Sequence, residues 1–215
     1  MKFINSRDFF VSKTKQIFES NFGQNFKKKL EILDIGGGLR IDPNKNNRFD
    51  KENFNAFKKY IIDKEFGLNY RIMDVVPDFN PDIVGNIEKL PFEEGEMDSI
   101  FCLAVLEHVE NPIKAVSECH RVLKNGGKAL FYVPFLFNYH AEVGYYKDYW
   151  RFTKDGCEYL FSKFSKIEIL AVSGRFETWG MLSGIKLIKI TGRFLDYLFV
   201  KETKQVSGYF IYVEK

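Results

Sequence analysis

Histidines and carboxylates lie close together in two short stretches of this sequence. The first stretch holds Glu107 and His108, and the second holds His140, Asp148 and Arg151. An imidazole has an ordinary pKa of about 6.5, so it can accept a proton from a hydroxyl group near neutral pH. We predict His140 as a general base, Asp148 as a second candidate or as the group that orients His140, and His108 as a third candidate.

A second interpretation of these residues is structural. A histidine such as His108, beside a glutamate, more often packs or forms a hydrogen bond than catalyses a reaction. Asp148 and Arg151 can form an ion pair that fixes their own loop, while Trp150 and Phe152 fill the core. The sequence leaves both interpretations open.

Aromatic residues are unusually frequent and concentrate around the second stretch. They form 17% of the 215 residues, with 23 Phe and 11 Tyr, and eight of the rings lie between Phe135 and Phe152. Rings beside carboxylates bind the apolar faces and hydroxyl groups of sugars and other flat, polar ligands. We therefore expect this segment to bind a substrate. The predicted substrate-binding residues are Tyr139, Tyr145, Tyr146, Trp150 and Arg151.

A glycine-rich turn in the N-terminal half predicts a nucleotide site. The apolar run Leu30–Ile35 is typical of a buried strand, and it leads directly into Gly36, Gly37 and Gly38. Because glycine has no Cβ, the backbone can turn sharply there and approach a ligand closely. The dinucleotide pattern G-x-G-x-x-G needs another glycine where Ile41 stands, so a nicotinamide cofactor is disfavoured.

An acidic residue, Asp74, lies in the next predicted strand, at residues 70–76. A carboxylate at this place can accept hydrogen bonds from both ribose hydroxyls of a nucleoside. Asp74 lies farther from Gly36 than the usual fingerprint has it, and the polar loop 39–48 accounts for the added length. A solvated aspartate at a strand end is the alternative.

The glycine turn resembles motif I of class I S-adenosylmethionine-dependent methyltransferases, which reads (D/E)-x-G-x-G-x-G. Asp34, Gly36 and Gly38 supply the pattern, whereas Arg40 occupies the third glycine position. A glycine-rich turn in some other α/β domain is the alternative interpretation of this motif taken alone.

Motifs farther along the chain resemble the same family, in its small-molecule, methyltransferase type 11-like branch. They are L-P-F at 90–92, L-E-H-V at 106–109, and R-V-L-K-N-G-G at 121–127, which is similar to R-V-L-K-P-G-G. With the glycine turn they span residues 32–134, about half the chain, in the order of the family. The resemblance implies S-adenosylmethionine as cofactor and S-adenosylhomocysteine as product. The implied cofactor-binding residues are Asp34, Gly36, Gly37, Gly38, Asp74, Val75, Asn86, Ile87, Leu103 and Ala104.

The resemblance also implies roles for some of these residues. Asn86 stands where an aspartate often accepts a hydrogen bond from the adenine amino group, and its amide oxygen can accept the same bond. Ile87 would pack on the adenine face. Leu103 and Ala104 would form the floor of the methionine end of the pocket.

The string D-Y-W-R-F-T at 148–153, with a histidine upstream, resembles a bacterial methyltransferase subgroup associated with surface-glycan and other secondary biosynthesis. Here His140 and Asp148 are eight residues apart, farther than in that subgroup, and an insertion at 143–147 accounts for the difference. The resemblance implies methyl transfer to a small-molecule or glycan-type acceptor, most readily at oxygen. The departures at Arg40 and Asn86 motivate an alternative, a non-catalytic relative that binds the cofactor or a protein partner.

Alternating strand and helix patterns must position these residues. Strands are predicted at 30–35, 70–76, 82–87, 98–103, 128–133, 167–172 and 208–213, and helices at 7–20, 51–64, 112–123, from Thr153 onward and at 179–199. With the resemblance, this pattern predicts an α/β, Rossmann-like class I methyltransferase fold with a mostly parallel seven-stranded sheet, helices on both faces and an antiparallel last strand. We expect one domain, 1–215, with an N-terminal helical segment 1–29, a cofactor-binding half 30–134 and an acceptor-side half 135–215.

Charge and composition exclude several other functions. The net charge of +3 comes without a basic cluster, and no N-P-P-Y-type motif follows the fourth strand, so a nucleic-acid methyltransferase is the third and least favoured alternative. No apolar run reaches the roughly 20 residues of a membrane span, and no secretory signal is recognisable. Three separated cysteines without a C-x-x-C pair predict reduced thiols, no metal site and a cytoplasmic protein.

The basic, amphipathic stretch 179–199 has three interpretations. It can cover the sheet or the pocket, form the face of a homodimer, or contact an anionic membrane peripherally. The sequence leaves open whether the protein is a monomer or a homodimer.

Overall fold

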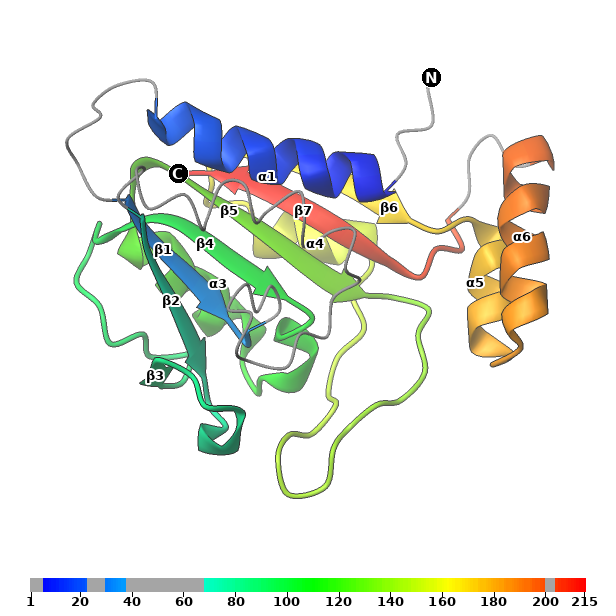
Figure 1. The fold of residues 1–215 in the computed structure, drawn as a ribbon, viewed down its shortest axis with the longest axis horizontal. Helices are drawn as coiled ribbons and strands as arrows, with labels where there is room; N and C mark the ends of the chain where they lie inside the picture. Colours follow the sequence, from blue (N-terminus) through cyan, green and yellow to red (C-terminus); the bar gives the residue numbers. More distant parts are fainter. Residues whose placement is uncertain (1–5, 23–29, 38–67, 200–203) are drawn as a thin grey trace.

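The computed structural model describes residues 6–22, 30–37, 68–199 and 204–215. Within them seven strands form one sheet (Figure 1): β1 Leu30–Ile35, β2 Leu68–Asp74, β3 Ile83–Val84, β4 Met97–Leu103, β5 Leu123–Pro134, β6 Lys166–Val172 and β7 Gly208–Glu214. Their order is β3-β2-β1-β4-β5-β7-β6. The first five strands in this order are parallel, and β7 is antiparallel to both β5 and β6. The predicted mostly parallel sheet with an antiparallel last strand is confirmed.

The strand order reverses at β1, which fixes where a ligand can bind. β1 pairs with β2 on one side and with β4 on the other, so that Ile35 lies opposite both Met73 and Cys102. The carboxyl ends of three parallel strands therefore meet at one edge of the sheet. In open α/β sheets, ligands bind in the crevice at such a switch point.

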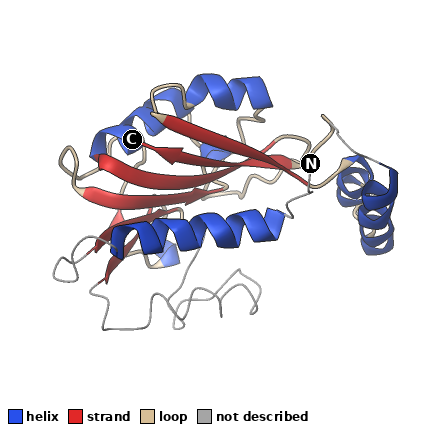
Figure 2. Ribbon diagram, turned by 90° about the horizontal axis from the view of Figure 1, so that it is seen from above, coloured by secondary structure: helices blue, strands red, loops and turns tan. Residues whose placement is uncertain are grey.

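Helices cover both faces of this sheet (Figure 2). The helical elements are α1 Ser6–Phe22, α3 Pro112–Val122, α4 Lys154–Leu160, α5 Arg175–Leu182 and α6 Lys186–Phe199, with two 3-10 turns, η2 Pro77–Phe79 and η3 Leu106–His108. On one face, Phe10 and Ile17 of α1 pack in a cluster with Tyr212. On the other face, Val116 of α3 and Phe161 beside α4 belong to the larger core cluster.

One predicted strand is much shorter in the structure, and some predictions lie outside the described residues. Strand 82–87 reduces to Ile83–Val84, because Asn86 bends the chain: it bridges to Lys89, and its Oδ1 atom accepts the Glu88 N–H at 2.8 Å. The predicted helix 51–64 and the predicted site residue Gly38 belong to the part of the chain that the structure does not describe.

The predicted single helical stretch 179–199 is wrong, because two helices occupy this region. A turn at Gly184, whose φ is +71°, separates α5 from α6, and the Ser183 Oγ atom accepts the N–H of Ile185 in that turn. The two helices pack on each other beyond one end of the sheet (Figure 1). Asp196 of α6 accepts the backbone N–H groups of Phe176 and Glu177, and so caps the first turn of α5.

This helical pair exposes large apolar side chains. Trp179, Leu187, Ile190, Phe194 and Tyr197 are all more exposed than buried. None of the helices in the described ranges has the length and apolar character that a membrane span requires.

Candidate active site

A cavity of about 1390 Å³ opens where the carboxyl ends of the parallel strands meet. One wall, which we call the cofactor wall, consists of the turn after β1 and the ends of β2 and β4. The opposite wall, which we call the acceptor wall, is formed by residues 139–147, Tyr149 and His108. Eight of the ten predicted cofactor residues line the cavity: Gly36, Gly37, Asp74, Val75, Asn86, Ile87, Leu103 and Ala104.

The glycine turn of the cofactor wall has no room for a side chain. Gly36 has a φ of +77°, and its N–H donates to the carbonyl of Met73 at 2.8 Å. A Cβ atom at Gly36 would overlap the Cγ2 atom of Val105, which follows β4. The turn is therefore packed against the end of a neighbouring strand and presents its backbone to the cavity.

The two acidic residues of the cofactor wall have different surroundings. Asp74 is 8% exposed and borders the cavity, with its Oδ1 atom accepting the Val76 N–H at 2.9 Å. Asp34 is fully buried, does not border the cavity, and accepts a hydrogen bond from the hydroxyl of Tyr70 at 2.5 Å. Burial raises the pKa of Tyr70, so that hydroxyl stays protonated and remains a donor. Asp74 thus faces the cavity, whereas Asp34 lies inside the sheet and pairs with Tyr70 of the neighbouring strand.

The end of β4 is strained. Ala104 has a φ of +57°, and its N–H donates to the carbonyl of Tyr132 at 3.0 Å. A left-handed conformation at a residue other than glycine costs about 1 kcal/mol or more and is found most often at functional sites. This bend turns the chain from β4 into η3, which carries Glu107 and His108.

An ion pair holds the acceptor-side loop. The Asp148 side chain is fully buried, and its two oxygens accept from Arg151 at 2.5 and 2.7 Å. Arg151 also donates to the carbonyls of Phe137 and Asn138, and Asp148 accepts the backbone N–H of His140. Arg151 lowers the pKa of Asp148 to about 2, so this carboxylate is a poor base at neutral pH. Its geometry fits the alternative role, that of positioning His140.

The aromatic residues of the acceptor side divide into two groups. Tyr139, Tyr145 and Tyr146 border the cavity, and the ring centroid of Tyr146 lies 4.4 Å from that of His108. Neither Trp150 nor Arg151 borders the cavity. The Trp150 indole N–H donates to the carbonyl of Val109, and its side chain is 43% exposed, so it does not fill the core as the structural interpretation had it.

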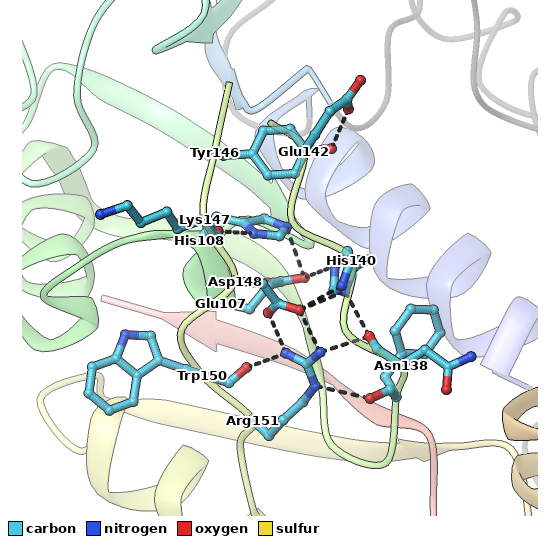
Figure 3. A network of polar contacts seen from close by, with 11 residues as sticks. Glu107, His108, Asn138, His140, Glu142, Tyr146, Lys147, Asp148, Trp150 and Arg151 are labelled. Carbon is cyan, nitrogen blue, oxygen red and sulfur yellow. Dashed lines mark hydrogen bonds and ion pairs between the residues drawn. The ribbon is translucent and has the colours of Figure 1, made fainter. Parts of the chain in front are cut away.

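Two histidines of the acceptor wall meet a buried glutamate that does not itself border the cavity (Figure 3). The Nε2 atoms of His140 and His108 lie 3.7 and 3.9 Å from Oε1 of Glu107, whose side chain is 1% exposed. The carboxylate of Glu107 is the main cause that raises the pKa of His140, and the carbonyl of Asn138 and the charge of Asp148 act in the same direction. The site residues predicted from sequence did not include Glu107. Its position beside His108, directly after a buried strand, is the signal that could have identified it.

Comparison with known proteins agrees with this fold. Residues 63–131 match the family model Methyltransf_11, described as a methyltransferase domain. The ubiquinone biosynthesis O-methyltransferase of Coxiella burnetii is 26% identical over 140 residues, which cover 63% of this chain and 50% of that protein. The chain spans half the length, or less, of the curated relatives it matches.

Two solved methyltransferases have a similar fold. A SAM-dependent methyltransferase from Archaeoglobus fulgidus superposes with a TM-score of 0.55 at 13% identity, covering 98% of this chain and 95% of that one. Phosphoethanolamine N-methyltransferase 2 of Haemonchus contortus, solved with phosphomonomethylethanolamine and S-adenosylhomocysteine, has a TM-score of 0.53 at 16% identity, covering 100% of this chain and 61% of that one. The fold is that of class I S-adenosylmethionine-dependent methyltransferases, and the resemblance seen in the motifs is confirmed.

Proposed function

We propose that this protein transfers a methyl group from S-adenosylmethionine to a hydroxyl oxygen of a small-molecule or glycan-type acceptor. The observation that carries the proposal is the cavity with two unlike walls. The cofactor wall offers glycine backbone and a carboxylate placed where it could accept from a ribose, and the acceptor wall offers rings, imidazoles and a carboxylate. The matched methyltransferase domain and the fold support the same cofactor.

When bound, S-adenosylmethionine supplies a methyl group on a positively charged sulfur, so the chemical drive comes from the cofactor. The chain has to align the acceptor oxygen with the methyl carbon and to exclude water. Asp74 would accept from the ribose hydroxyls, and the backbone at Gly36 would allow the methionine end to approach β1. Transfer forms one C–O bond and breaks one C–S bond, whose electrons stay on sulfur, and the hydroxyl proton must leave.

The acceptor wall supports an oxygen acceptor that carries hydroxyl groups. The phenol group of Tyr146 donates to Glu142 within this wall, and that of Tyr145 donates to Asp78 of η2, so each of these rings is paired with a carboxylate. Such a surface suits a sugar or another hydroxylated ring. The name of the Coxiella burnetii relative, an O-methyltransferase, points to the same atom. His140 and His108 border the cavity and are the candidates for the general base that removes the proton of the acceptor hydroxyl.

Calorimetry on the full chain tests the cofactor half of the proposal. We expect S-adenosylhomocysteine to bind with a micromolar dissociation constant. Asp74→Ala should weaken that binding by about tenfold or more, because it removes charge-assisted hydrogen bonds to the ribose. Asp155→Ala, which removes an exposed carboxylate from α4, is the matched control for the change in net charge and should leave affinity unchanged. No binding by the intact chain would exclude the proposed enzyme.

Labelled methyl transfer tests the acceptor half. Incubation with methyl-labelled S-adenosylmethionine and a small-molecule extract should give a labelled product that resists mild base, as a methyl ether does. A labelled amine would instead move the acceptor atom to nitrogen. Cofactor binding with no labelled product from any extract would favour the non-catalytic alternative.

A further inference from the structure

We propose that Glu107, His108 and His140 bind a divalent transition-metal ion, of which Zn²⁺ is the representative, on the acceptor wall of the cavity. In the described part of the chain, one ligand atom from each of these three residues lies within 4.8 Å of the others. Binding of the ion follows from the cluster alone. Its role in methyl transfer rests on the proposed function.

The hydrogen bond of His108 determines which of its ring nitrogens can bind a metal. Nδ1 lies 2.7 Å from the backbone carbonyl of Lys147, which can only accept, so Nδ1 must carry the proton of a neutral ring. Nε2 then has a free lone pair, and it is the atom that faces Glu107. A metal-binding histidine commonly donates its other N–H to a carbonyl in this way.

In its neutral form, the ring of His140 repeats this arrangement from the loop between β5 and α4. Its Nδ1 lies 3.0 Å from the carbonyl of Asn138 and 3.2 Å from a carboxylate oxygen of Asp148, and both of these partners accept. Nε2 is again left with a lone pair that faces Glu107, at 3.7 Å. Asp148 is itself fixed by Arg151, so the orientation of the ring is set by a chain of contacts through the buried Asp148 carboxylate (Figure 3).

Glu107 closes the cluster with a third acceptor. Its side chain is 1% exposed, and neither of its carboxylate oxygens has a hydrogen-bond donor among the described residues. Two neutral imidazoles and a carboxylate would thus direct lone pairs at one another inside the protein, which is unfavourable unless a cation lies between them. The separations of 3.7 and 3.9 Å are too long for direct hydrogen bonds. Two ligands of one tetrahedral Zn²⁺ are about 3.4 Å apart. The two separations from Glu107 would have to shorten by a few tenths of an ångström, and the widest pair in the cluster, within 4.8 Å, by about an ångström or slightly more.

The ligand set indicates the kind of ion and its use. Two imidazoles and one carboxylate suit Zn²⁺ and related first-row ions better than Mg²⁺, which prefers oxygen ligands. Three protein ligands leave a coordination position open toward the cavity, as in catalytic zinc sites. An acceptor hydroxyl bound there would lose its proton to water more readily, and its oxygen would be the nucleophile.

Metal analysis of the full chain tests this inference directly. After chelator treatment and dialysis against Zn²⁺, we expect one bound zinc per chain, and Co²⁺ in its place should give visible absorption bands of a site with nitrogen ligands. Glu107→Gln and His140→Ala should each weaken Zn²⁺ binding by at least tenfold. The control is His120→Ala, which removes the third histidine of the chain, a residue that packs on Phe164 away from the cluster.

The outcomes separate this inference from the proposed function. Zinc binding that the cluster variants lose and His120→Ala keeps supports the site. Absence of zinc binding, or equal binding by the Glu107→Gln and His140→Ala proteins, overturns it, and would mean that one imidazole is protonated and forms an ion pair with Glu107. S-adenosylhomocysteine calorimetry on the same variants shows whether they are folded. Cofactor binding without zinc binding leaves the proposed function standing, and zinc binding without cofactor binding does the reverse.

Discussion

The two walls of the cavity are stabilised in different ways. The cofactor wall consists of strand ends, where backbone groups and small side chains meet the cavity and where Gly36 and Ala104 adopt positive φ angles. Apart from the histidine on η3, the acceptor wall belongs to a loop that has no helix or regular strand between β5 and α4. This loop is held by backbone hydrogen bonds to η3 and to the end of β5, and by the ion pair of Asp148 with Arg151. Backbone geometry and steric packing define the cofactor wall, whereas a buried ion pair helps to hold the acceptor wall.

Because the two walls are held differently, substitutions in them should affect stability and ligand binding differently. A strand end is fixed by the whole sheet. A larger side chain there overlaps its neighbours and leaves less room for a ligand, so it should weaken ligand binding. A loop fixed by a buried ion pair depends on both partners, because a single remaining charge is costly to keep buried. We therefore expect the two walls to respond independently.

The largest effect is expected on the acceptor wall, from Arg151→Met. The substitution leaves the fully buried Asp148 carboxylate without its main partner, so the free energy of unfolding should fall by about 3 kcal/mol. Urea denaturation measures this loss. Affinity for S-adenosylhomocysteine should stay within about twofold of the original, since no cofactor contact changes.

Lys154→Met is the matched control for that loss. It breaks the ion pair of Lys154 with Glu158 on α4, whose side chains are 61% and 53% exposed, and should cost about 0.5 kcal/mol or less. If both variants lose the same small amount, the buried pair does not hold the loop. If Arg151→Met abolishes cofactor binding in a protein that is still folded, the walls are not independent.

A smaller effect, on binding, is expected from Gly36→Ala on the cofactor wall. The added Cβ overlaps Val105, and the turn must move away from β4, so affinity for S-adenosylhomocysteine should fall by about 100-fold. Calorimetry gives this number. The double variant Gly36→Ala with Val105→Ala removes the overlapping methyl group and should recover part of the affinity.

Gly126→Ala separates overlap from backbone strain. Gly126 has the same φ of +77° as Gly36, but a Cβ atom there meets nothing within 4 Å. Both single variants should lose similar stability from the left-handed conformation, whereas cofactor affinity should fall only for Gly36→Ala. Equal loss of affinity in the two would show that strain, and not the shape of this wall, governs binding.

A third, smaller effect is expected where the acceptor-side loop ends. Thr153 caps α4, with its Oγ1 atom accepting the N–H of Gly156 at 3.1 Å. Thr153→Ala should lower the free energy of unfolding by about 1 kcal/mol, measured by thermal or urea denaturation, while Thr153→Ser keeps the cap and should lose much less. A loss as large as that of Arg151→Met would mean that the cap fixes the loop as strongly as the ion pair does.

The cofactor wall could be predicted from sequence because its signals are local. The apolar run Leu30–Ile35, the glycines after it and the acidic residue Asp74 are short patterns whose meaning depends on neighbouring residues, and the structure places them at the carboxyl ends of adjacent strands. Where a turn competed with a strand or helix, prediction failed. Asn86 shortened one expected strand, and Gly184 divided one expected helix.

The acceptor wall could be predicted only in part because its contacts are distant in sequence. The histidines were identified by residue type, but the approach of His140 to Glu107 depends on the path of a loop whose course no periodicity encodes. The sequence left two interpretations of Asp148 open, and its complete burial beside Arg151 shows that the ion pair is formed. Local sequence patterns are enough to predict where strands end. Which polar side chains pair with each other depends on tertiary burial, which no local pattern encodes.

The smallest effect is expected from a partly exposed ion pair that lies outside both walls and holds the turn after β3. Glu118 of α3 pairs with Arg121 and accepts the N–H of Leu90, and Arg121 lowers the pKa of Glu118. A lowered pKa stabilises the folded protein above the unfolded value of about 4.3, and this stabilisation is lost as the pH falls through the folded value. Glu118→Gln should therefore cost about 0.5 to 1 kcal/mol at pH 7 and progressively less below pH 4 or so, measured by urea denaturation across that range. A cost that stays constant with pH would assign the effect to packing, and a cost near 3 kcal/mol would remove the contrast with the buried ion pair of the acceptor wall.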